Sequence, residues 1–88
     1  MNLYAYVVIN KNEEIEGVYS SVKSAYRDAV KLCNQTNSPV RYVGENGELK
    51  KVSLADVRVH FKEMTQGVLK LSSGSRVSVK ILKCPFLS

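Results

Sequence analysis

Apolar and polar positions alternate at the start of the chain as β-strands require. Leu3 to Ile9 is rich in β-branched and aromatic side chains, and Ile15 to Tyr19 repeats this character after a polar interval. The interval, Asn10 to Glu13, is made of residues typical of turns. The pattern predicts two antiparallel strands joined as a hairpin.

A helical period follows the first hairpin. Apolar residues recur three and four positions apart and form one stripe: Val22, Ala25, Tyr26, Ala29, Val30 and Cys33. Ser20 and Ser21 are N-cap residues, and Pro39 cannot continue a helix. The spacing therefore predicts an amphipathic helix that ends before Pro39.

A second hairpin is predicted after this helix. The segments Val40 to Val43 and Leu49 to Val52 flank the turn from Gly44 to Glu48. That turn contains Asn46-Gly47, the strongest short-range signal for a hairpin.

The segment from Leu54 to Gln66 fits two different structures. Ser53 and Asp56 have the spacing of a capping box, and Gly67 is a suitable helix end. Apolar residues recur between them at helical spacing: Leu54, Val57, Phe61 and Met64. Alternation from Val57 to Phe61 fits a strand instead. The cap and the length of the pattern favour the helix.

The end of the chain predicts a third hairpin and completes the fold. Val68 to Leu71 and Arg76 to Leu82 flank a turn, and Cys84 follows the last predicted strand. The predicted order is ββαββαββ, an α+β fold with a mainly antiparallel sheet and two helices on one face. A length of 88 residues leaves room for a single domain.

The N-terminal part resembles small uncharacterised proteins of phages and bacteria. The resemblance rests on Tyr6-Val7-Val8 and on Glu14 to Ser21, with Ala25 completing the pattern V-Y-S-S-x-x-x-A. It covers the first hairpin and the start of the first helix. It implies a phage or viral context and assigns no functional residue.

Residue types that carry catalysis or bind metals are sparse. His60 is the one histidine and neighbours the second apolar stripe, so we interpret it as a boundary or surface residue. Cys33 and Cys84 are too few for a disulfide framework or a zinc site, and we expect two buried or half-buried thiols, with a bridge between them left open. The acidic residues between 13 and 16 match no calcium loop and are expected at a solvated hairpin tip. The sequence therefore predicts no catalytic set, no cofactor and no metal site, and thus a protein that is not an enzyme.

Positive charge is concentrated in the second half. Residues 49–88 contain eight Lys or Arg against two Asp or Glu, whereas residues 1–48 contain five against six. Arg76 and Lys80 alternate with apolar residues in the last strand, so we expect them on the outer face of the terminal hairpin with Lys70 beside them. The alternation predicts that the intervening residues pack inward: Val77, Val79 and Ile81.

These features favour a small binding module that docks on a protein partner. Such a module could be a phage or viral inhibitor or an assembly subunit, and a homo-oligomer is also compatible with the sequence. The alternative is a nucleic-acid-binding protein that uses the basic surface of residues 49–88. Tyr4 and Tyr6 share a strand face and would extend that alternative to base stacking, although core or rim positions suit them better. The candidate interaction surface is Lys70, Arg76, Lys80, Arg58, Lys62, Lys23, Arg27, Lys31, Tyr4 and Tyr6. Without a span of about 20 apolar residues or a signal peptide, we expect no membrane partner and an intracellular location.

Overall fold

The computed structural model describes residues 3–33, 40–44, 46–62, 64–73 and 77–86. Within them the elements follow the order ββαββαββ, which confirms the predicted α+β fold. They are β1 (Leu3–Ile9), β2 (Ile15–Tyr19), α1 (Val22–Cys33), β3 (Val40–Val43), β4 (Leu49–Lys51), α2 (Leu54–Lys62), β5 (Gly67–Ser73) and β6 (Val77–Phe86).

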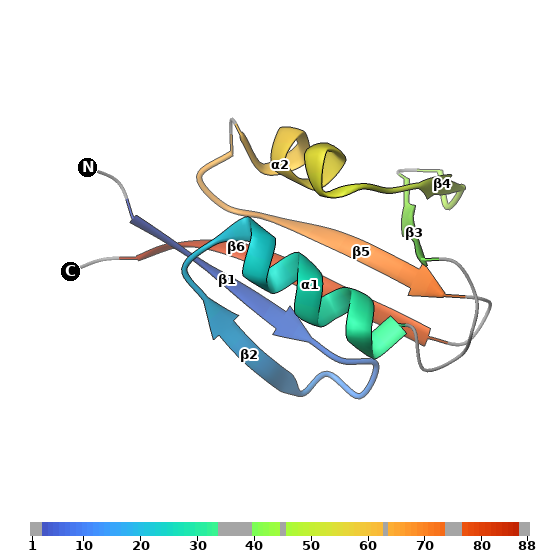
Figure 1. The fold of residues 1–88 in the computed structure, drawn as a ribbon, viewed down its shortest axis with the longest axis horizontal. Coiled ribbons are helices and arrows are strands. Elements are labelled where there is room, and N and C mark those ends of the chain that lie inside the picture. The colour runs from blue at the N-terminus through green and yellow to red at the C-terminus, as the bar shows by residue number, and fades with distance from the viewer. Residues whose placement is uncertain (1–2, 34–39, 45, 63, 74–76, 87–88) are drawn as a thin grey trace.

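The strands form one six-stranded sheet in the order β2-β1-β6-β5-β3-β4. All of its recorded pairs are antiparallel. Figure 1 shows α1 lying along the sheet in front of β6, with β1 beside it, while α2 lies on the β5 side of the molecule. In the described part of the chain no helix covers the opposite side of the sheet, which we call the open face.

The turn between β1 and β2 is built by an asparagine. The Oδ1 atom of Asn10 accepts hydrogen bonds from the backbone N–H groups of Asn12 and Glu14, at 2.9 and 3.0 Å. Glu13 adopts a left-handed backbone conformation with φ of 64°. Asparagine side chains stabilise turns in this way because they replace a backbone acceptor.

The helix α1 has the predicted bounds, and the predicted stripe is buried in part, with Val22, Tyr26 and Val30 half-buried. Ala25, Ala29 and Cys33 are buried against the sheet. At its start the Oγ atom of Ser21 accepts a hydrogen bond from the backbone N–H of Ser24 at 3.2 Å. This N-cap satisfies one of the amide groups that the first turn leaves without a helical partner.

The ambiguous segment after Val52 is a helix, and it is shorter than the sequence predicts. The capping box forms: Asp56 accepts from the backbone N–H of Ser53 at 2.9 Å, and Ser53 Oγ accepts from the Asp56 N–H at 3.3 Å. However, α2 ends at Lys62 instead of continuing to Gln66. The backbone carbonyl of Phe61 accepts a hydrogen bond from the side chain of Lys83, on β6, so a tertiary contact satisfies an acceptor at the helix end.

The terminal hairpin is longer than the sequence predicts. Gly67, expected to end the second helix, is instead the first residue of β5, and β6 runs to Phe86. Cys84 therefore lies inside β6, where the prediction placed it after the strand. The reason is that β6 has a partner on each side, since β1 pairs with it from Lys80 to Phe86.

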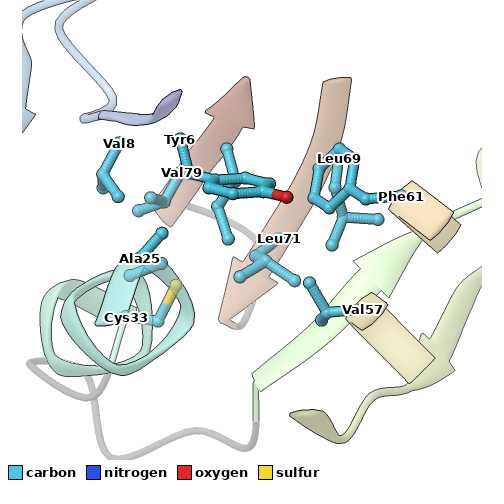
Figure 2. Close-up of a cluster of buried hydrophobic side chains, with 11 residues drawn as sticks. Tyr6, Val8, Ala25, Cys33, Val57, Phe61, Leu69, Leu71 and Val79 are labelled. Carbon is cyan, nitrogen blue, oxygen red and sulfur yellow. The ribbon is translucent and has the colours of Figure 1, made fainter. Parts of the chain in front are cut away.

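The core lies between the sheet and the two helices. Figure 2 shows Val8, Tyr6 and Leu71 of the sheet facing residues of both helices. The rings of Tyr6 and Phe61 meet edge to face with centroids 5.9 Å apart, a favoured aromatic geometry. The buried apolar residues are Tyr6, Val8, Ala25, Ala29, Cys33, Val57, Phe61, Leu69, Leu71, Val79 and Ile81.

Candidate interaction surface

The open face carries a line of apolar side chains across four adjacent strands. Val18 pairs with Val7, Val7 with Leu82, and Leu82 with Val68. Residues directly opposite one another in paired strands project to the same side of the sheet. Their neighbours Tyr6, Leu69 and Ile81 are buried under the helices, so these four residues project away from them. We call Val18, Val7, Leu82 and Val68 the apolar row.

The apolar row is accessible to solvent, especially at its ends. Val18 is 61% exposed and Val68 is 42% exposed, while Val7 and Leu82 are half-buried. Beside the row, Ile15 pairs with Ile9 on the same side, and Ile15 is 67% exposed. Contiguous exposed apolar surface of this kind is typical of interaction sites.

Basic side chains flank the apolar row on the open face. Lys70 lies directly opposite Lys80, and Arg41 lies directly opposite Lys51. These four residues form what we call the basic flank. The Nζ atom of Lys80 is 2.8 Å from a carboxylate oxygen of Glu13. For Lys70, none of the ion pairs in the described part of the chain supplies an acidic partner.

The predicted arrangement of the terminal hairpin is confirmed for the residues that the structure describes. Lys70 and Lys80 lie together on the outer face, and Val79 and Ile81 are buried on the other. Arg76 lies outside the described residues, as does the side chain of Val77.

The other predicted basic stripes lie on the opposite side of the molecule. Five exposed cations belong to the helix layer: Lys23, Arg27 and Lys31 of α1, and Arg58 and Lys62 of α2. The fold therefore divides the basic candidates between the helix layer and the open face and does not bring them onto one surface.

The candidate tyrosines lie on the covered face of β1. Tyr6 is in the core, and burial raises its pKa, with a further contribution from nearby Tyr4. Tyr4 is half-buried, and its ring centroid lies 4.2 Å from the Nζ atom of Lys83. Neither ring is presented on the open face.

Lys83 is a charged residue in the core, and the sequence analysis did not predict that it is buried. It is 5% exposed, on the face of β6 that also carries Val79 and Ile81. Its ammonium donates to the Phe61 carbonyl at 2.6 Å. The alternation of β6 contained a signal, because two-residue steps from Val79 lead through Ile81 to Lys83 on the inward side.

A shallow pocket between α2 and the sheet contains the only histidine. Its volume is about 280 Å³, and it is lined by Tyr42, Val52, Asp56, Val57, Val59, His60 and Leu69. The Nε2 atom of His60 lies 3.1 Å from the Val68 carbonyl, and its ring packs edge to face on Phe61. These contacts fit the boundary position expected for His60. Among the described residues no group of three His, Cys, Asp or Glu is placed to hold a metal ion.

The two cysteines are not joined by a disulfide. Cys33 is buried on α1, where burial raises the pKa of its thiol to about 11. Cys84 is half-buried on β6, opposite Ala5 and on the same side as Leu82. One thiol is thus in the core and the other borders the apolar row.

Comparison of the chain with protein-family models, curated proteins and solved structures finds no match. Within the described residues, no helix is both long and apolar enough to cross a membrane.

Proposed function

We propose that this protein is a non-enzymatic binding module that docks on a protein partner through the open face of its sheet. The apolar row is the observation that carries the proposal. It crosses four strands, and its end residues Val18 and Val68 are exposed. Removing apolar surface from water is favourable by roughly 25 cal/mol per Å². A partner that covers the row would therefore gain binding energy without any rearrangement of the sheet.

The surroundings of the row favour a protein surface as the partner. Stable protein interfaces combine an apolar centre with a polar rim, and opposite charges on the two rims orient the complex. Here Lys70, Arg41 and Lys51 provide a cationic rim on the β5-β3-β4 side. The matching surface is apolar at its centre and acidic at its rim.

A second candidate function is nucleic-acid binding, which one observation favours. The contacting helices α1 and α2 expose five Lys or Arg side chains, and residues 49–88 carry the excess of positive charge. Phosphate backbones bind such surfaces with strong salt dependence because bound cations are released. Labelled single- and double-stranded RNA and DNA, titrated with the protein at increasing salt, test this candidate. Salt-sensitive binding that Arg27→Glu with Arg58→Glu abolishes would favour it over the protein partner.

Site-specific photo-crosslinking tests the leading proposal. A photoreactive amino acid is placed at Val18, on the open face, and in a second chain at Val59, which is 73% exposed on α2. Both positions are exposed and apolar, so Val59 controls for non-specific capture. In the cells that produce the protein, we expect position 18 to give protein adducts of defined mass and position 59 to give none. The adducts from position 18 should disappear when the substitution Leu82→Glu is added. Equal adducts from both positions, or nucleic-acid adducts alone, would contradict the proposal.

A further inference from the structure

We propose that the protein surface that covers the open face is that of a second copy of this chain. The two sheets would pack face to face about a two-fold axis parallel to the strands. This inference rests on the proposed function and names its partner. Three observations support it: the apolar centre of the open face, the distribution of its charges and the size of the molecule.

The apolar row complements itself under this symmetry. A two-fold axis between β1 and β6 reverses the strand order from one copy to the other. Val18 of one copy then lies over Val68 of the second, and Val7 lies over Leu82. The exposed Val18 of each copy thus covers the exposed Val68 of the other copy. All four residues of the apolar row are then buried in both copies. Aligned packing of two sheets with interdigitating apolar residues is the arrangement of β-sandwiches.

The charges on the open face are also self-complementary. The β1–β2 turn carries Glu13, which is exposed and lies 2.8 Å from Lys80 of the open face. Three residues of the basic flank lie beyond β6 from this turn, on β5, β3 and β4: Lys70, Arg41 and Lys51. The acidic turn and the basic residues lie at the same end of the strands. β1 and β5 run in the same direction, since each pairs antiparallel with β6, and Ile9 and Lys70 are both level with Lys80. The turn follows Ile9 in β1, and Ser72, which pairs with Arg41, follows Lys70 in β5. Rotation about the proposed axis thus moves the acidic turn of one copy toward Lys70 and Arg41 of the other.

Two lysines of the basic flank face each other across β5 and β6. Lys70 and Lys80 are directly opposite each other, and like charges in that position destabilise a sheet. Glu13 offsets Lys80 through their 2.8 Å contact. Lys70 has no equivalent acid among the ion pairs of the described residues, and the acidic turn of a second copy would supply one.

The molecule is large enough to form a stable dimer through one of its faces. Seen down its shortest axis, as in Figure 1, the molecule measures 39 by 24 Å. Typical specific interfaces bury about 800 Å² on each partner. One face of a molecule with these dimensions is of the size that such an interface buries.

Sedimentation equilibrium of the purified chain tests the second copy as partner. We expect a monomer–dimer equilibrium for the wild-type protein and at least a tenfold weaker dimer for Val18→Asp. The matched control Val59→Asp changes an equally exposed valine on α2 and should dimerise like the wild type. Circular dichroism establishes that both variants are folded. A wild-type chain that stays monomeric, or a Val18→Asp dimer as strong as the wild type, would overturn the inference.

A charge exchange tests the two-fold arrangement. Arg41→Glu places like charges against the acidic turn of the other copy, and Glu13→Lys places them against the basic flank, so each variant alone should dimerise weakly. Mixing the two variants restores opposite charges at both contacts and should restore the dimer. A mixture no stronger than the separate variants would overturn this geometry. If the chain is monomeric while position 18 still crosslinks to a different protein, the second-copy inference fails and the proposed function stands.

Discussion

The side chain of Lys83 caps the end of α2: its Nζ atom donates a hydrogen bond to the carbonyl of Phe61 at 2.6 Å. A cation at a helix C-terminus also interacts favourably with the helix dipole. The ammonium further lies over the ring of Tyr4. One residue thus connects β6, α2 and β1 within the core.

We expect Lys83→Met to lower the free energy of unfolding by about 1–3 kcal/mol, because it leaves the Phe61 carbonyl without its buried partner. Urea denaturation followed by circular dichroism measures the change. Lys62→Met, at an exposed position of α2, serves as the control and should stay within about 0.5 kcal/mol of the wild type. An equally stable Lys83→Met would mean that desolvation of the ammonium cancels its contacts.

The capping box of α2 makes a separate contribution to stability. Ser53→Ala removes the Oγ acceptor of the Asp56 N–H, and we expect a loss of about 1 kcal/mol. Thermal unfolding, compared with Ser20→Ala at an exposed position outside both helices, measures this effect. A Ser53→Ala protein as stable as the Ser20→Ala control would show that the cap is dispensable.

The two faces of the terminal hairpin should respond oppositely to charge. Val79→Asp buries an unpaired carboxylate in the core and should cost several kcal/mol, enough to unfold a domain of this size. Lys70→Glu, on the open face, should leave the fold intact and relieve the repulsion with Lys80. Two-dimensional NMR spectra of the variants distinguish these outcomes. A folded Val79→Asp protein would contradict the assignment of the core face.

The buried thiol predicts a pH dependence of stability. Burial raises the pKa of Cys33 from 9.0 to about 11, so the unfolded chain loses this proton at a lower pH than the folded chain. The thiol's contribution is therefore fully present below pH 9.0 and is lost as the pH rises to about 11, by roughly 1.4 kcal/mol per pH unit. Denaturation curves of wild type and Cys33→Ala across this range isolate the effect. A constant difference between the two proteins would refute it.

Local patterns were sufficient to predict most elements of this fold. The stripe from Val22 to Cys33 predicts α1 at its observed bounds, and the spacing of Ser53 and Asp56 predicts the cap of α2. The early end of α2 could not be predicted from local sequence. The carbonyl of Phe61 at this end accepts a hydrogen bond from Lys83, which lies 22 residues away in the sequence.

The candidate surface could be predicted only in part. Alternation placed Lys70 and Lys80 on the same outer face, since both belong to one hairpin. The apolar row depends on the pairing of β1 with β6, which joins opposite ends of the chain and leaves no local signal. The alternation in β1 also does not show which face of the strand the helices cover, because Val7 and Val8 are equally apolar. Only the position of the helices, over Val8, distinguishes the two residues.

Methyl NMR at increasing protein concentration tests most directly whether the open face is the contact surface between copies. If copies meet through the open face, the methyl signals of Val7, Val18, Val68 and Leu82 should shift or broaden as the concentration rises. The Val59 signals on α2 should not change. Invariant signals from the apolar row, or changes confined to the helix layer, would show that copies do not meet through the open face.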